Sequence, residues 1–376
     1  MHNRIIDDDE RLARLRLIRS DNVGAITWHR LMTRFGSAVK ALDALPDLMQ
    51  RGGARAGRVC DIETAQRELS AAQRSGLTAV FYDEPAYSER LAQIDDAPPL
   101  LYVGGSIHLL NRPAIAVVGA RNASANGRTI ARDLAQEMAG ISLGDDPMSI
   151  VSGLARGIDT AAHEGALAAS GVTVAVMAGG ADHVYPRNNE SLYQQIIETG
   201  AVVSEMPPGL KPQARHFPRR NRIVSGLSLG VVVVEAAARS GSLITARMAL
   251  EQGREVFAVP GSPRDPRCHG TNSLIRTGAT LTQTADDIVE VLAPMLRIPQ
   301  RLQTQPETAS QNLPDSTDSL NERERQAILD CSSPTPVTVD EIVRQCQVTA
   351  SVVQMVLLEL ELAGRLERQP GNRVAT

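Results

Sequence analysis

The feature that most restricts the fold is a repeated unit in the middle of the chain: a short apolar segment, a turn that contains glycine, and a helical segment. Short, β-branched apolar runs are typical of strands that are buried on both faces. We expect strands at residues 114–118, 149–151, 173–178, 201–204, 229–234 and 255–259, and helices at 127–139, 158–169, 189–199, 243–252 and 271–277. Strand–helix units of this length predict an α/β fold, a Rossmann-like doubly wound parallel sheet with helices on both faces.

The flanking regions differ from these units in composition. The first region carries apolar residues at helical spacing, and a polar stretch rich in Gln, Pro, Ser and Thr follows the last unit. The final region has three helical segments and a short β-wing pattern. We therefore expect a helical SAM-like or helix-hairpin-helix-like domain (1–72), a Rossmann-like domain (73–297), a flexible linker (298–320) and a winged-helix domain (321–376).

Residues 22–36 of the first region resemble half of a helix-hairpin-helix, a motif whose glycine-containing hairpin can present backbone N–H groups to a phosphate. A small helical bundle packed around Trp28, without a ligand, explains the same residues equally well. No chemistry is therefore assigned to this segment.

Composition limits the functions that the chain can have. The formal net charge is -4, so a site for a polyanion must be a local patch, and the 3% aromatic content leaves few positions for base stacking. The four cysteines form no CxxC pair and no HExxH pattern occurs, so we expect no disulfide, no metal and no cofactor. No signal-peptide core or membrane-length apolar stretch occurs, which predicts a cytoplasmic protein with no membrane partner.

A basic segment precedes the apolar run 229–234. No acidic residue occurs from Met206 to Val234, and five cations lie in its first part: Lys211, Arg215, Arg219, Arg220 and Arg222. We expect a basic loop here that favours a polyanion over a small acid, although a solvated loop is the alternative. The three arginines around Asn221 stand at a potential helix start and cannot all point one way, so at least one is expected to form an internal ion pair.

Three turns supply candidate phosphate contacts. After the run 229–234, Ser240, Gly241 and Ser242 open a helix, whose free N–H groups and dipole attract anions. The turn after the strand 114–118 departs from the dinucleotide pattern GxGxxG because Arg121 replaces the second glycine. The forked guanidinium of an arginine suits a phosphodiester. This arginine could instead cap the helix or pair with a carboxylate. The remaining turn residues are Gly119, Arg121 and Ser124 in one turn, and Ser152, Gly153, Arg156 and Gly157 in the next.

All these turns follow strands, and in a parallel sheet they share one edge, where ligands bind. A single strand of DNA could lie there, with its phosphates held by backbone N–H groups and its path fixed by arginines. Tyr185 and Phe217 are the aromatic candidates for stacking on a base, unless they pack beneath their own loops. Asp159 and His163 lie four apart on one helix face and are interpreted as a structural pair, because no nucleophile elbow is nearby.

The third helical segment of the last domain, 350–363, contains Glu359 and Glu361 but no Lys or Arg. A helix that reads the major groove normally carries cations or amides. We therefore expect this domain to dock on protein or to serve a structural role, while wing arginines keep phosphate contact open: Arg365, Arg368 and Arg373.

The long motifs between residues 100 and 296 resemble the DNA-processing protein DprA (Smf) family. They read VVGARNAS, IVSGLARGIDTAAHEGAL, VAVMAGGADHVYPRNNESL, FPRRNRIVSGLS and VVVVEAAARSGSLITARMALEQGREVFAVPG. The resemblance implies a homodimer formed through the Rossmann-like domain. It also implies a protein that binds single-stranded DNA, protects incoming DNA and loads the recombinase RecA in natural transformation and homologous recombination. The family's binding residues carried onto this sequence are Gly119, Arg121, Ser152, Gly153, Arg156, Arg219, Arg220, Asn221 and Arg222.

An enzyme is the rival interpretation. The fold is similar to that of phosphoribohydrolases of the lysine-decarboxylase-like family, nucleotide-processing enzymes that place a catalytic Glu after a PGGxGT turn. The matching turn here is SGSLITA, and the next glutamate is Glu251. Only Glu205 and Glu235 remain as acids near the edge, so we expect no enzyme and assign no catalytic residue.

Overall fold

The computed structural model describes residues 6–53, 57–143, 146–297, 322–369 and 372–376. The chain divides into two compact units. The described part of the first unit spans residues 67–297, and the second joins residues 6–66 to residues 322–376. The expected linker at 298–320 lies outside the described residues.

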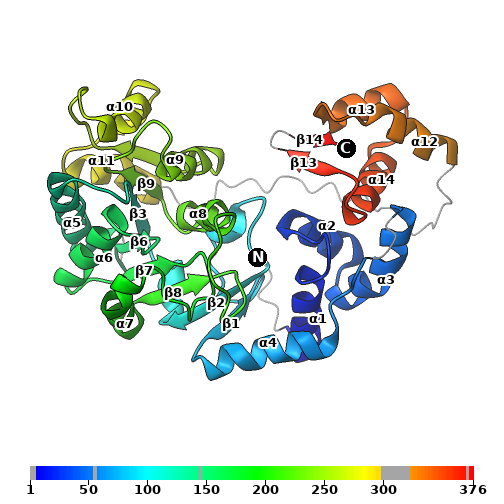
Figure 1. The fold of residues 1–376 in the computed structure, drawn as a ribbon, viewed down its shortest axis with the longest axis horizontal. Helices are drawn as coiled ribbons and strands as arrows, with labels where there is room; N and C mark the ends of the chain where they lie inside the picture. The colour runs from blue at the N-terminus through cyan, green and yellow to red at the C-terminus, as the bar shows by residue number, and fades with distance from the viewer. Residues whose placement is uncertain (1–5, 54–56, 144–145, 298–321, 370–371) are drawn as a thin grey trace. The chain divides into compact units, whose positions relative to one another are not determined.

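The first unit is built on a nine-stranded sheet within the described residues, in the order β1-β2-β8-β7-β6-β3-β9-β10-β11 (Figure 1). Neighbouring strands are parallel from β8 through to β11, whereas β2 is antiparallel to both β1 and β8. The doubly wound prediction is confirmed, with one reversed strand near the edge. The strands are β1 Thr78–Phe81, β2 Leu100–Gly105, β3 Ala114–Val118, β6 Ser149–Ser152, β7 Thr173–Val176, β8 Ala201–Ser204, β9 Gly230–Val233, β10 Glu255–Ala258 and β11 Thr280–Leu281.

Helices cover both faces of this sheet. Alternate residues of a strand point to opposite faces, so Ile115 and Val117 pack in one core cluster while Ala116 and Val118 pack in the other. The first face carries α5 Ala125–Ala139, α6 Ile158–Ala168, α7 Glu190–Thr199 and α11 Ala285–Arg297, and the opposite face carries α8 His216–Gly226, α9 Gly241–Glu251 and α10 His269–Arg276. Short elements complete the unit: η1 Leu91–Gln93, η2 Ile107–Asn111, η3 Arg187–Asn189, η4 Pro266–Cys268, and the β4 Ser142–Leu143 and β5 Asp146–Pro147 pair.

The strand order reverses between β3 and β9. From β3 the chain moves outward through β6, β7 and β8, and then returns through α8 to β9 on the other side of β3. At such a point the loops on the carboxyl ends of the strands diverge and leave a crevice, which is where open α/β sheets bind ligands.

The basic segment before β9 differs from the sequence prediction. The expected loop is a helix from His216 onward, and Pro218 is tolerated because it lies in the first turn, where no intrahelical N–H bond is lost. A helix separates consecutive side chains by about 100°. The arginines of α8 therefore face different surroundings.

The second unit contains the helical and winged-helix domains. Its first part comprises α1 Asp8–Ile18, α2 Ala25–Phe35, α3 Ala38–Arg51 and the start of α4 Ile62–Arg74, packed around Trp28, which is 1% exposed. Its second part comprises α12 Glu322–Cys331, α13 Val339–Cys346, α14 Ala350–Leu362, and a sheet of β12 Val337–Thr338, β14 Arg373–Ala375 and β13 Glu367–Gln369. No helix among the described residues is long and apolar enough to cross a membrane.

Candidate nucleic-acid interface

Two adjoining pockets occupy the carboxyl edge of the parallel strands, with volumes of about 300 Å³ and 570 Å³. Both are lined by Arg121, Gly153, Ala155 and Phe217, which form the boundary between them. We call the turns after β3, β6, β7 and β9, with the first turn of α8, the rim. The predicted site residues that line the pockets are Gly119, Arg121, Gly153, Arg156, Tyr185, Phe217, Arg220, Asn221, Ser240, Gly241 and Ser242.

A cation and two aromatic rings form a row along the rim. The guanidinium carbon of Arg121 lies 4.7 Å from the centroid of the Phe217 ring, within the range of a cation–π contact. The Phe217 and Tyr185 rings lie 6.1 Å apart at an interplanar angle of 63°. Tyr185 is 50% exposed. Because these rings are accessible at a pocket wall, they can offer apolar faces to a ligand while the guanidinium offers charge.

Arg220 forms the floor of the larger pocket rather than its surface. Its side chain is buried, and its Nη1 donates to the backbone oxygen of Val176 at 2.9 Å. Burial lowers the pKa of Arg220, and the charge of Asp159 opposes that effect. A Cβ on Gly153 would lie 1.5 Å from Arg220 Nη1, so only glycine leaves room for the guanidinium at this turn.

Asp159 and His163 do not bond to each other, although they share a helix face. The Asp159 carboxylate accepts from the backbone N–H of Gly153 at 3.2 Å and holds the turn after β6. Burial raises the pKa of Asp159, against the effect of the Arg220 charge. His163 Nδ1 lies 2.7 Å from the Thr173 hydroxyl, and burial followed by the charge of Arg220 lowers its pKa to about 3. Both residues serve the structure, through different partners.

The expected internal ion pair in the basic segment is confirmed at Arg222. Its guanidinium lies 3.3 Å from an Asp96 oxygen and 2.5 Å from a Glu205 oxygen, and its side chain is 9% exposed. Arg222 therefore fastens α8 to the unit and lines neither pocket. Arg219, about one turn earlier in the same helix, is exposed.

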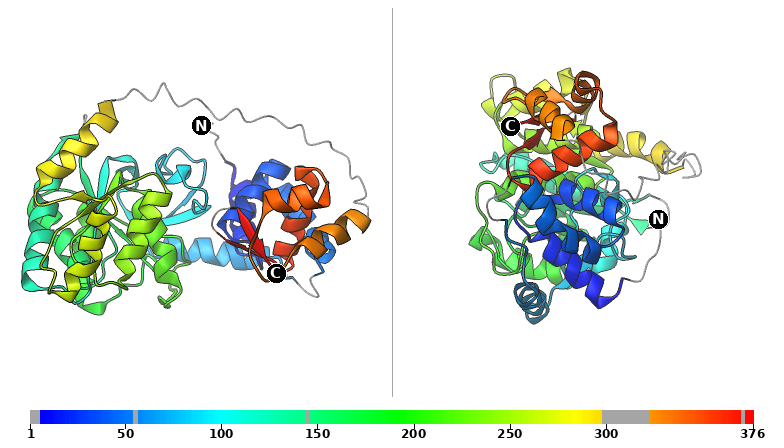
Figure 2. Two further views of the ribbon diagram at one scale, coloured as in Figure 1. Left: turned by 90° about the horizontal axis from the view of Figure 1, so that it is seen from above. Right: turned by 90° about the vertical axis from the view of Figure 1, so that its right-hand side faces the viewer.

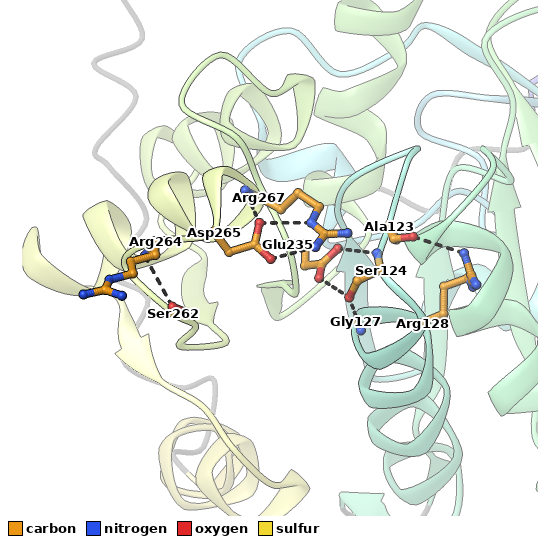
Figure 3. A network of polar contacts seen from close by, with 9 residues as sticks. All are labelled: Ala123, Ser124, Gly127, Arg128, Glu235, Ser262, Arg264, Asp265 and Arg267. Carbon is orange, nitrogen blue, oxygen red and sulfur yellow. Dashed lines mark hydrogen bonds and ion pairs between the residues drawn. The ribbon is translucent and has the colours of Figure 1, made fainter.

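Glu235 closes the start of α5, at the end of β9 (Figure 3). Its carboxylate accepts from the backbone N–H of Ser124 at 2.9 Å and from the Ser124 hydroxyl at 2.6 Å. The Ser124 hydroxyl in turn accepts from Gly127 N at 2.8 Å as the helix N-cap. A Cβ on Gly127 would lie 2.5 Å from the Glu235 carboxyl carbon. An internal carboxylate thus occupies the position at Ser124 where the sequence predicts a bound phosphate.

The start of α9 has a different environment, since no carboxylate among the described residues is hydrogen-bonded to it. Ser240 is the N-cap and accepts from Ser242 N at 3.4 Å, and the two hydroxyls lie 2.7 Å apart. Asn221 Nδ2 donates to the Gly241 oxygen at 3.4 Å, which links α8 to this turn. Ser240, Gly241 and Ser242 line the larger pocket, where the positive end of the helix dipole favours an anion.

Two predicted turn residues have structural roles. Ser152 is fully buried, and its hydroxyl donates to the Val117 oxygen at 2.6 Å, which joins β6 to β3. Gly157 has a φ of +86°, and a Cβ there would lie 2.3 Å from the Ala120 oxygen. Neither residue lines a pocket, but together they fix the turns after β3 and β6 against each other.

The remaining cations surround the pockets. Lys211, Arg215 and Arg219 are exposed and line neither pocket. Within the described parts of the chain, none of these three forms an ion pair, and neither do the pocket-lining Arg121, Arg156 and Arg239. An unpaired exposed cation retains its full capacity to meet a phosphate.

Sequence reasoning missed several lining residues. Arg239 stands one residue before Ser240, and its place directly ahead of the predicted helix start was a usable signal. His183 and Asn188 belong to the same loop as Tyr185. Arg267 enters from the distant η4 and pairs with Asp265, its Nη2 at 2.7 Å from a carboxylate oxygen, and no local pattern marks it.

Comparison with known families gives three matches in chain order. Residues 78–293 match the model for DNA recombination-mediator protein A, residues 8–71 match the DprA-like N-terminal HHH domain, and residues 305–372 match the DprA winged helix domain. The first match alone covers more than half of the chain.

The chain belongs to the DprA family. It is 42% identical over 295 residues to Protein Smf of Escherichia coli (strain K12), covering 78% of this chain and 75% of that protein. It is 44% identical over 227 residues to DNA processing protein DprA of Bacillus subtilis (strain 168), covering 60% and 75%. The predicted family is confirmed, and with it the helical and winged-helix modules.

Two solved DprA structures are similar to this one. The X-ray structure of DNA processing protein A from Streptococcus pneumoniae gives a TM-score of 0.65 at 34% identity, covering 76% of this chain and 98% of that one. A structure of DNA processing protein A from Helicobacter pylori, described for its single-stranded DNA binding mode, gives 0.51 at 28% identity, covering 59% and 98%.

Proposed function

We propose that the rim of this DprA-family protein binds single-stranded DNA, and that the protein protects incoming DNA and loads RecA onto it in natural transformation and homologous recombination. The observation that carries the proposal is the contact between Arg121 and Phe217 at the boundary of the two pockets. It joins a fixed cation to an accessible ring, as a nucleotide with a phosphate and an aromatic base requires.

The charges of the rim favour a chain of phosphates over one small anion. Arg121 and Arg239 line the larger pocket, and Arg121 and Arg156 line the smaller one. Together with the start of α9, these cations would contact successive phosphates of a DNA strand that lies across both pockets. Binding of this kind depends strongly on salt and little on sequence.

The aromatic residues favour a single strand over a duplex. A ring can stack on a base only where that base is unstacked from its neighbours. Tyr185 is half exposed and Phe217 partly so, which leaves both available to an unpaired base. The relative from Helicobacter pylori, described as binding single-stranded DNA, supports the same ligand for this chain.

Both acids that the enzyme interpretation would use have partners within the protein. The Glu235 carboxylate is bound to Ser124, and the Glu205 carboxylate is bound to Arg222. A general acid or base must reach its substrate. Nothing in the arrangement of the rim favours the hydrolysis of a nucleotide.

The first test is a fluorescence-anisotropy titration of the full chain with labelled oligo-dT and with a duplex of equal length, at two salt concentrations. We expect preference for the single strand and weaker binding at high salt. Arg121→Ala and Arg156→Ala should each weaken binding to the single strand. The matched control is Arg247→Ala, an exposed arginine of α9 that lines neither pocket. Equal affinity of all three variants and the unchanged protein would contradict the rim as the binding site.

Loading of RecA and dimerisation need separate measurements. We propose that two copies join through the Rossmann-like domain, so that two rims can hold one longer strand. ATP hydrolysis by RecA on oligo-dT covered by a single-strand-binding protein should begin sooner when this protein is added. Light scattering should give the mass of a dimer. An unchanged RecA lag would contradict loading even if the rim binds DNA.

A further inference from the structure

The third helix of the winged-helix domain, α14, is buried on two sides. One side belongs to the domain's own core at the spacing of a helix face, through Val353, Val356, Leu357 and Leu360. Leu358 and Leu362 are 4% and 0% exposed, yet they do not belong to that core cluster. Because they lie four residues apart and two positions from Val356 and Leu360, they face away from the core.

Helices of the N-terminal domain cover this second side. Asn22 Nδ2 donates to the Leu362 backbone oxygen at 2.9 Å, and so meets a carbonyl that lacks a partner within its helix. The Thr27 hydroxyl donates to Glu361 Oε1 at 2.7 Å. In both views of Figure 2, the red helix α14 lies against the blue helices of the same compact unit. The hairpin that resembles a phosphate-binding motif thus contacts protein.

The end of α3 approaches α14 closely. A Cβ on Gly52 would lie 1.9 Å from the Glu359 backbone oxygen, so this contact excludes every residue but glycine. The Glu359 side chain is fully buried, with Arg325 Nη1 2.7 Å away and Arg51 Nη1 4.0 Å away. Arg325 also donates to the backbone oxygen of Arg51.

Each glutamate of α14 therefore pairs with one arginine from the winged-helix domain and one from the N-terminal domain. Glu359 has Arg325 of the winged-helix domain and Arg51 of the N-terminal domain. Glu361 has Arg368 at 3.0 Å from its own domain and Arg30 at 3.5 Å from the other. A buried carboxylate is tolerated only when it is paired and hydrogen-bonded. This two-sided pairing accounts for the acidic character of a helix in the place where a winged helix would read DNA.

We propose that α14 is the docking surface for the N-terminal helical domain of the same chain, and that this docking withholds the helix from DNA. The two ends of the chain then form one cooperative folding unit. DNA contact is left to the rim.

The test uses Trp28, the chain's single tryptophan, which lies in the N-terminal domain next to Thr27. Urea unfolding of the full chain is followed by Trp28 fluorescence for Glu361→Gln, for Thr27→Val and for the double variant. Glu361→Gln should raise the unfolding constant seen at Trp28 about fivefold, although the change lies in the other domain. The two effects should be less than additive, because Glu361→Gln removes the charge from the acceptor of the same hydrogen bond that Thr27→Val deletes.

The matched control is Glu341→Gln, which alters an exposed ion pair of α13 and should leave the Trp28 transition unchanged. The proposal is overturned if Glu361→Gln changes the unfolding constant seen at Trp28 no more than this control does. It is also overturned if the effects of Glu361→Gln and Thr27→Val are fully additive. A transition that depends on protein concentration would mean docking between two chains and would also overturn the proposal.

A second variant tests the close approach of α3. Gly52→Leu should shift the Trp28 transition to lower urea, because its side chain meets the backbone of α14. Gly24→Ala, where a Cβ has nothing within 4 Å, should not. Equal transitions for these two variants would overturn the docking surface.

Discussion

The Arg121 guanidinium lies 4.7 Å from the centre of the Phe217 ring, where the turn after β3 meets the first turn of α8. The ring holds the guanidinium at the boundary between the two pockets. Charge and stacking surface are thus combined at one place, and the two contributions can be separated by their dependence on salt.

Phe217→Leu should weaken binding to oligo-dT about tenfold, because stacking on a base contributes about 1–3 kcal/mol. The slope of log affinity against log salt should stay unchanged, since no charge is removed. Arg121→Ala should lower the magnitude of that slope by about 0.7, the value for one phosphate contact on a single strand. Anisotropy titrations at several salt concentrations measure both. A Phe217→Leu variant that binds normally would show that the ring only packs beneath its helix.

Gly153→Ala should lower both stability and binding. The new methyl group would lie 1.5 Å from Arg220 Nη1 and would displace a buried guanidinium that is bonded to Val176. Overpacking of this kind costs about 1–3 kcal/mol. The matched control is Gly241→Ala at the other side of the larger pocket, where a Cβ has nothing within 4 Å. Urea denaturation and oligo-dT titration of both variants check the expectation, and equal stability would contradict it.

Two neighbouring arginines of α8 should give opposite results. Arg222→Met removes the cation that pairs with Glu205 and Asp96 and should cost about 3 kcal/mol of stability, because the Glu205 carboxylate is largely buried and loses its neutralising charge. Arg219→Ala should change the free energy of unfolding by less than about 0.5 kcal/mol, since the side chain is exposed. It should weaken oligo-dT binding instead. If Arg219→Ala binds as well as the unchanged protein, the proposed path does not pass over α8.

The contrast between these arginines explains what the sequence could predict. Buried strands stand out as apolar runs, and β3 and β8 appear at the predicted bounds. The segment 211–222 shows its charge but hides its helical phase, because its two prolines, Pro212 and Pro218, suggest a loop. Without that phase, Arg219, Arg220 and Arg222 cannot be assigned to surface, pocket floor and ion pair.

Long-range contacts limited the prediction at Ser124 as well. Its partner Glu235 lies at the end of β9, and the two meet only because β9 pairs with β3. No local spacing marks that relationship. The same holds for Glu361 and Thr27, which lie near opposite ends of the chain. The acidic character of α14 was visible in the sequence, but the arginines that balance it were not.

The buried His163 predicts an acid-dependent loss of stability. Burial and the charge of Arg220 lower its pKa to about 3, from 6.5 in an exposed histidine. Between these values the unfolded chain binds a proton at this residue and the folded chain does not. The free energy of unfolding should therefore fall by about 1.4 kcal/mol per pH unit as the pH drops below 6.5. Above 6.5 the histidine is neutral in both states, and its contribution is constant.

Asp159 acts in the opposite direction, since its pKa is raised by burial and the folded state takes up its proton first as the pH falls. The contribution of His163 is therefore obtained as a difference between proteins. Urea denaturation from pH 7.5 to 4.5 should give a shallower loss of stability for His163→Asn than for the unchanged chain. His108→Asn, at an exposed position, should follow the unchanged chain. If His163→Asn loses stability as steeply as the unchanged protein, the lowered pKa of His163 does not contribute to the acid-dependent loss.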